Sequence, residues 1–351
     1  MMDRDALKAL FLSQVSTPST TSTVERLAKQ LNAAGKHATV EQRIELASAL
    51  AHAAFLAPDR IAEVYDAVTL GWRGDHVNAE PIATLPDNAS EPAPEGLWDA
   101  YWAVVEDAVD GKLDALAITE RTAALGQWMP ERFVQRVAAS AYLYPGIKEA
   151  AKAPLPPHMT LERLAACPPG SLGRQFHDLI VDNTFDLEVL DRDALGLSAL
   201  PEPLAFLNTR ILQAHDLWHI TAGYETTALH EIAISAFQMA QFGHNYSAQF
   251  LSITAAVSAL TPARGAVVLY DTITTAWAHG RETEPLMLIE WEEELDKTLA
   301  DIRSEYGIRA YQRPYPANLI ERAGQVNALL NRVKSLFSWL SRRKQTANAS
   351  A

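Results

Sequence analysis

The feature that most constrains the fold is a long run of apolar residues at helical spacing in the second half of the chain. Over residues 232–260 these side chains recur at gaps of four and three, until Thr261-Pro262 interrupts the pattern. Such spacing places them on one face of a helix, whereas a strand would require alternation. The stripe consists of Ile232, Ala236, Met239, Gly243, Tyr246, Phe250, Ile253, Val257 and Leu260.

No convincing run of alternating strand residues appears elsewhere in the chain. We therefore expect a mostly α fold, a helical bundle, in which residues 232–260 form one long helix.

Just before this stripe stands the sequence His215-Asp216-Leu217-Trp218-His219, which concentrates potential metal ligands. Residues four apart lie on the same face of a helix, so the two imidazoles point the same way, with Asp216 about 100° round from His215. A histidine pair one turn apart is a common helical metal clip, and carboxylates complete a mixed nitrogen and oxygen ligand set. The alternative without a functional role is a solvated or core histidine pair that holds no metal.

Glu231 can join this site only if the helix is broken. Twelve further helical residues would carry it roughly 18 Å past His219. Gly223 suits the C-terminal cap of a first helix, and Thr226 or Thr227 suits the N-cap of a second. We therefore predict a helix-turn-helix metal site made by His215, Asp216, His219 and Glu231.

His230 is a rival ligand to its neighbour Glu231. On a helix it points about 100° away from Glu231, so we expect it to be a neighbour of the ligands or a surface residue.

Composition excludes several classes of function. A formal net charge of −13 argues against a nucleic-acid partner, because such proteins need a basic surface. The single Cys167 rules out an internal disulfide framework, fits a reducing compartment and is expected to be a small buried residue. No apolar run is long enough for a spanning helix, and the acidic start lacks a targeting sequence, so we expect a soluble or peripheral protein.

We divide the chain into four segments. Residues 1–75 are predicted as an N-terminal helical extension and residues 76–96, rich in Pro, Asp, Glu and Asn, as a linker. Residues 97–316 are predicted as the helical metal-binding core, and residues 317–351 as a basic amphipathic tail.

The tail differs in charge from the rest of the chain. Its apolar residues from Leu319 to Leu340 form one helical stripe, and it carries six basic residues against Glu321 alone. Such a helix suits an anionic membrane surface. The alternative is a helix that packs on the body of the protein or on a second copy, as in a homodimer.

Two further features are candidates for substrate binding. Arg174 ends a turn, Pro168-Pro169-Gly170-Ser171-Leu172-Gly173-Arg174, that feeds a helix, and it could position a carboxylate or form a structural salt bridge. The small residues Ala236, Ala240 and Gly243 allow either a close helix approach or an apolar groove.

Three landmarks together resemble the ubiquinone (coenzyme Q) biosynthesis protein 4 family. The first is the turn that ends at Arg174, and the second is His215-Asp216-x-x-His219 with its spacing to Glu231. The third runs from Ala276-Trp277 through Gly280-Arg281, Pro285-Leu286 and Glu290-Trp291-Glu292-Glu293 to Tyr306-Gly307-Ile308. The resemblance covers about 120–310, and residues 1–95 and those after about 312 match nothing in the family pattern.

The resemblance implies a mostly helical fold and a divalent metal, zinc, iron or manganese, held at positions His215, Asp216, His219 and Glu231. It also implies a polyprenylated hydroxybenzoate substrate whose ring carboxyl at C1 is replaced by a hydroxyl. The prenyl tail of such a substrate needs an apolar channel, and we expect its wall to be formed by Ala236, Ala240 and Gly243. The family is also regarded as an organiser of other ubiquinone-biosynthesis enzymes. We accordingly expect a cytoplasmic protein, peripheral on the inner membrane of a bacterium or on the equivalent face of the mitochondrial inner membrane.

Rival functions follow from the same residues. One is a non-catalytic scaffold that binds a prenylated intermediate and docks other enzymes, with a purely structural metal. Another is a His-Asp phosphohydrolase, which would need further spaced His and Asp ligands that do not stand out here. A third is a helical interaction protein without a metal.

Overall fold

The computed structural model describes residues 3–86, 89–183, 187 and 197–324. Within this part of the chain the regular elements are helices, and the one extended pairing is an isolated antiparallel bridge between Ser171 and Thr298. The predicted mostly α fold is confirmed, and no described helix is long and apolar enough to cross a membrane.

The helices before the predicted metal motif are α1 (Arg4–Val15), α2 (Thr21–Ala34), α3 (Val40–Leu56), α4 (Ile61–Arg73), α5 (Leu97–Val109), α6 (Ala115–Ala124), α7 (Glu131–Ala141), α8 (Ile147–Ala150), α9 (Leu161–Ala165) and α10 (Leu172–Asn183). Those from the motif onward are α11 (Leu204–Ala222), α12 (Ala228–Phe242), α13 (Asn245–Leu260), α14 (Ala263–Arg281), α15 (Trp291–Glu294) and α16 (Leu299–Glu305). Short 3-10 turns include η3 (Leu125–Trp128) and η4 (Leu197–Ala199).

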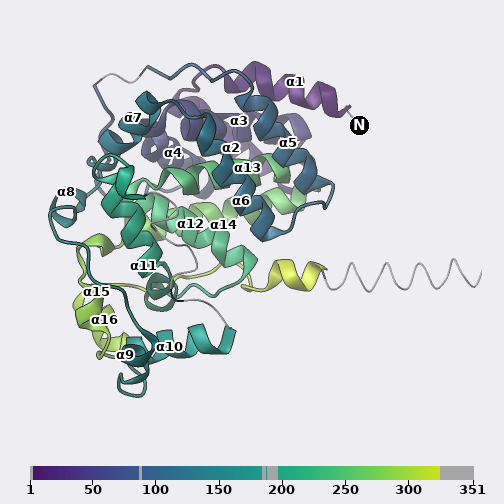
Figure 1. The fold of residues 1–351 in the computed structure, drawn as a ribbon. Coiled ribbons are helices and arrows are strands. Elements are labelled where there is room, and N and C mark those ends of the chain that lie inside the picture. The colour runs from purple at the N-terminus through teal and green to yellow at the C-terminus, as the bar shows by residue number, and fades with distance from the viewer. Residues whose placement is uncertain (1–2, 87–88, 184–186, 188–196, 325–351) are drawn as a thin grey trace, which may run out of the picture.

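The centre of the molecule is formed by α12, α13 and α14, all from the second half of the chain. α14 packs along α12, and α13 packs along α3 (Figure 1). α11 lies beside them, and α9, α10, α15 and α16 cluster at one end. The predicted metal motif therefore sits between the helical centre and this end cluster.

The predicted N-terminal extension shares one hydrophobic core with the rest of the protein. Phe11 of α1 stacks on Tyr101 of α5, with ring centroids 5.1 Å apart. Two tryptophans tie α4 to α14 in reciprocal fashion: Trp72 donates to Asp271 and Trp277 donates to Asp66, each at 2.7 Å. Through α3 and α4, the first four helices thus pack on α13 and α14, and α14 in turn packs on α12, the helix of Glu231.

The predicted linker is fastened to helices on both sides of it. The backbone of Glu91 donates to the carbonyl of Leu56 at 2.7 Å, and Arg281 of α14 donates to the carbonyl of Glu80 at 2.6 Å. These bonds hold the connection between α4 and α5 against the core.

The prediction of one long helix over 232–260 is wrong. α12 ends at Phe242, Gly243 adopts a left-handed conformation with φ of +66°, and α13 begins at Asn245. A left-handed glycine is a common helix terminator. The apolar spacing continues across the break because both helices bury a face against the same core, so the spacing alone could not reveal the turn.

Other details agree with the sequence. Cys167 is buried, as expected. The turn before Arg174 leads into α10. Of the predicted basic tail, only residues 317–324 belong to the described part, where Ala317 accepts a hydrogen bond from Thr227 and Glu321 accepts one from the backbone of Ala228. The rest of the tail, and with it the predicted amphipathic helix, lies outside the described residues.

α12 and α14 approach closely at a glycine. A Cβ added at Gly280 would lie 2.6 Å from the carbonyl oxygen of Phe237 and 2.7 Å from the Cβ of Ala240. Both neighbours belong to α12, so the contact involves backbone and a methyl group that cannot rotate away. The pairing of these two helices depends on the missing side chain.

We expect Gly280→Ala to lower the free energy of unfolding by about 1–3 kcal/mol, because overpacking a rigid contact displaces backbone. Gly265→Ala is the matched control on the same helix: its Cβ would meet only Thr261 Oγ1, at 3.6 Å. That change should leave stability unchanged or raise it by up to about 1 kcal/mol. Urea denaturation measures both, and equal stabilities of the two variants would contradict the close approach.

Candidate metal centre

The helix break that the site requires is present. α11 ends at Gly223, which has φ of +80° and whose backbone nitrogen donates to the carbonyl of His219 at 3.0 Å. Thr227 is the N-cap of α12, and Glu231 lies in the first turn of that helix. The predicted helix-turn-helix is confirmed, with Thr227 and not Thr226 at the cap.

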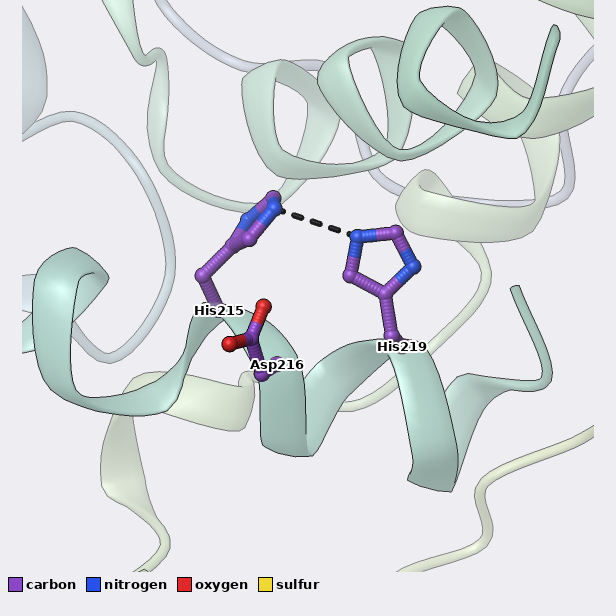
Figure 2. Close-up of side chains that lie close together, drawn as sticks. All are labelled: His215, Asp216 and His219. Carbon is purple, nitrogen blue, oxygen red and sulfur yellow. Dashed lines mark hydrogen bonds between the residues drawn. The ribbon is translucent and has the colours of Figure 1, made fainter. Parts of the chain in front are cut away.

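Two imidazoles and a carboxylate converge across this turn. The Nε2 atoms of His215 and His219 are 3.1 Å apart, and Figure 2 shows the two rings facing one another from successive turns of α11. One oxygen of Glu231 lies 3.6 Å from Nε2 of His215, and the other lies 3.4 Å from Nε2 of His219. The turn therefore brings Glu231 back to the histidine pair.

These separations fit a shared cation. Four ligand atoms placed about 2.0–2.1 Å from a zinc-sized ion at tetrahedral corners stand about 3.3 Å from one another. The observed distances of 3.1, 3.4 and 3.6 Å lie close to that edge length. His215, Asp216 and His219 also each offer a ligand atom within 4.8 Å of the others, and Asp216 stands beside the pair in Figure 2. The donor set of imidazole and carboxylate suits zinc, iron or manganese.

The cluster has a buried side and an open side. The side chain of His219 is 2% exposed, whereas those of His215 and Glu231 are 31% and 45% exposed. A metal held here would be anchored from the protein interior and would keep positions free on its outer side. Open positions distinguish catalytic from purely structural zinc sites.

The pKa shifts at the cluster reflect opposite charges brought together. Burial raises the pKa of Glu231, but hydrogen bonds from His215 and His219 outweigh it and hold that pKa well below its usual range. Burial lowers the pKa of His215, but the hydrogen bond and charge of Glu231, with the charge of Asp216, raise it overall. Glu231 is therefore ionised at neutral pH, which is the form that binds a cation.

The outer nitrogens of both histidines have partners that fix the rings. Nδ1 of His219 lies 3.3 Å from the carbonyl of Tyr224, and Nδ1 of His215 is hydrogen-bonded to the side-chain amide of Gln238. At His219, an Nδ1–H donated to this carbonyl leaves Nε2 with its lone pair toward the cluster, as a metal ligand requires. At His215 the amide nitrogen of Gln238 is the donor and Nδ1 accepts. Gln238 was not predicted, although it lies seven residues beyond Glu231 and hence on the same face of α12.

Behind the cluster, an aromatic group holds the turn in place. Tyr224 stacks on Tyr311, with centroids 4.5 Å apart, and its hydroxyl donates to Nδ1 of His279 at 2.8 Å. His230, the rival ligand, is buried in this group, where its Nδ1 accepts from the backbone of Glu225 at 2.7 Å. It is therefore a neighbour of the ligands and is not a surface residue.

Arg174 lies on α10 with partners of its own. It donates to Asp178 on the same helix at 3.1 Å and to the carbonyl of Ala165 at 3.4 Å. Its side chain is 40% exposed. These contacts correspond to the salt-bridge alternative, and a role in positioning a carboxylate stays a prediction.

The three small residues proposed for a prenyl channel have different surroundings. Ala236 and Ala240 are buried, and Ala240 faces Gly280 in the close approach of α12 and α14. Gly243 instead lies at the turn before α13, where an added Cβ would be 2.5 Å from the ring of Tyr144. Gly243 also lines a pocket that the sequence did not reveal.

That pocket has a volume of about 320 Å³ and lies along α11. One wall is formed by α11 through Leu204, Leu207, Asn208 and Ile211, and the opposite wall by α7 through Phe133, Val134, Val137 and Ala141. The α11 residues are spaced at three and four, so their face continues, one turn further on, to His215. Gly243 and His244, at the turn between α12 and α13, also line the pocket.

Comparison with known proteins bears on the same part of the chain. Residues 156–312 match the family model described as Coenzyme Q (ubiquinone) biosynthesis protein Coq4. This part of the chain is similar to the Coq4 family. The predicted resemblance is thus confirmed, with a start at 156 where about 120 was expected, and all three landmark motifs lie inside the match.

Curated relatives with Coq4 names match over a similar length. The Ubiquinone biosynthesis protein COQ4 homolog, mitochondrial, of Drosophila erecta is 28% identical over 149 residues, which cover 41% of this chain and 52% of that protein. The Ubiquinone biosynthesis protein coq4, mitochondrial, of Botryotinia fuckeliana is 26% identical over 161 residues, 43% of this chain and 51% of the relative. The chain therefore spans about half the length of these relatives.

One solved structure is also similar. It is a crystal structure from Nostoc punctiforme described as that of a ubiquinone biosynthesis protein, with a TM-score of 0.47 and 20% identity, and the match covers 62% of this chain and 98% of that one.

Loss of a ligand should abolish metal binding. We expect His219→Ala to weaken zinc or manganese binding by more than about a hundredfold, since even residues that only orient a ligand typically affect affinity by about 10–100-fold. Glu231→Gln should also weaken it, because the amide carries no charge. Glu225→Gln, on the same turn but paired with Arg313, is the control and should bind like the parent chain. Elemental analysis and chelator competition measure this, and an unchanged metal content in His219→Ala would exclude the site.

Proposed function

We propose that this chain acts in ubiquinone biosynthesis as a divalent-metal-dependent enzyme that replaces the C1 carboxyl of a polyprenylated hydroxybenzoate with a hydroxyl. The observation that carries the proposal is the convergence of His215, His219 and Glu231. An apolar pocket, whose lining residue Ile211 lies one turn of α11 before His215, supports it. The similarity to the Coq4 family supports the pathway and the reaction class, and the imidazole and carboxylate side chains support a divalent metal.

The overall chemistry is an oxidation. Converting a ring carboxylate and water into a ring hydroxyl, carbon dioxide and a proton releases two electrons, for which we propose dioxygen as the acceptor. A bound divalent cation would supply positive charge that binds the carboxylate or phenolate and stabilises negative charge on the ring as carbon dioxide leaves. Zinc alone does not transfer electrons, so this reaction favours iron or manganese.

The residues of the chain have separable roles in this scheme. His219 and Glu231 hold the cation from the inner and outer sides, and Gln238 fixes the ring of His215. The pocket between α7 and α11 accepts the apolar part of the substrate, and the polar ring then lies toward His215. The pocket is at the small end of the usual range for ligand sites, so it would hold the ring and only the first part of a prenyl chain.

The competing proposal is a scaffold that binds a prenylated intermediate without reacting. We expect purified chain loaded with iron or manganese to convert 3-geranyl-4-hydroxybenzoate to the decarboxylated, hydroxylated product in the presence of dioxygen. Glu231→Gln should abolish this turnover, and Glu225→Gln should keep it. Mass spectrometry of the product measures both, and full metal loading with bound substrate and no product would favour the scaffold.

We also propose that the protein works at an anionic membrane surface, where prenylated substrates and other ubiquinone-biosynthesis enzymes reside. The support is compositional: Arg332, Lys334, Arg342, Arg343 and Lys344 follow the last described residues. A chain that ends at residue 324 keeps the contacts of Ala317 and Glu321 and should lose flotation with anionic liposomes. Unchanged flotation would show that the tail is not the anchor.

A further inference from the structure

Of the residues that the structure describes, one histidine, His244, belongs to the pocket. Its ring lines the pocket at the junction of α12 and α13. Burial, and after it the positive charge of His215, lowers the pKa of His244 to about 3. The imidazole is therefore neutral at physiological pH.

The position of His244 is set by a rigid turn. Gly243 is left-handed, and the ring of Tyr144 packs where its side chain would be. The ring of His244 lies between those of Phe242 and Tyr246, with centroids 6.0 and 5.8 Å away. Its Nδ1 is 2.9 Å from the hydroxyl of Ser247. These contacts fix the ring and leave Nε2 as the nitrogen it can offer to a ligand.

The other polar residues of the pocket are already engaged. Asn208 donates to the carbonyl of Leu204, Asn245 donates to the carbonyl of Ala54, and Gln249 donates to Asn245. Among the described residues, no hydrogen bond is recorded for Nε2 of His244. A pocket with apolar walls and an available imidazole nitrogen suits an apolar ligand that carries a hydrogen-bonding group.

We propose that His244 contacts the substrate directly and hydrogen-bonds a hydroxyl group on its aromatic ring, next to the metal cluster. A neutral imidazole nitrogen donates or accepts according to its tautomer, and a ring hydroxyl can serve as partner in either case. The inference rests on the proposed function, because it takes the ligand to be a hydroxylated aromatic with an apolar chain. It adds a specificity residue that lies outside the metal motif.

The test compares two probes that differ by one hydroxyl, 3-geranyl-4-hydroxybenzoate and 3-geranylbenzoate, on metal-loaded full-length chain. We expect the parent chain to bind the hydroxylated probe about threefold to tenfold more tightly, the value of one hydrogen bond. In His244→Leu this ratio should fall to about one with affinity for 3-geranylbenzoate retained, and His244→Gln should recover part of it. His37→Asn, on the surface, is the control.

The outcomes separate the two proposals. Binding of both probes with an unchanged ratio in His244→Leu overturns the role of His244 alone. Failure of the metal-loaded parent chain to bind either probe overturns the substrate class of the proposed function. The ratio, measured by titration calorimetry, would not change if His244 only held the turn, because a structural defect weakens both probes alike.

Discussion

The site depends on the convergence of His215, His219 and Glu231 across the turn between α11 and α12. A single helix holds two imidazoles at this distance without difficulty, but it cannot supply a third ligand from further along the same chain. Gly223 ends the first helix in a conformation that other residues rarely adopt, and Thr227 starts the next. The turn between the two helices brings Glu231, which is twelve residues further along the chain, next to His219.

Gathering these groups requires support from the rest of the fold. The carbonyl of Tyr224 holds His219, and Tyr224 is held by Tyr311 and His279. The latter two come from segments far along the chain, so the metal site and the α12–α14 pairing form one packed unit. The same pairing needs Gly280, and α14 is in turn tied to α4 through Trp72 and Trp277. The N-terminal helices lie outside the family match. They support the site indirectly, because α4 holds α14 and α14 packs on α12.

Much of this could be predicted from the sequence because the signals are local. The spacing of His215 and His219, Gly223 as terminator and Thr227 as cap are each set by neighbours in the chain. The break at Gly243 was missed because apolar spacing continued through it and hid the backbone reversal. Gln238, His244 and the pocket were also missed: each depends on which side chain of another helix stands opposite, and α7 meets α11 only through tertiary packing. Arg174 is the opposite case. The sequence motif suggested a role in positioning a carboxylate, whereas in the structure its side chain forms a surface ion pair with Asp178.

The central claim is that one divalent cation binds between the imidazoles and Glu231. The most direct measurement is anomalous diffraction from crystals of the chain loaded with manganese or zinc. The account predicts a peak about 2.0–2.2 Å from Nε2 of His215, Nε2 of His219 and a carboxylate oxygen of Glu231. A fully loaded crystal whose peak lies elsewhere, or touches only one of the three residues, would contradict it.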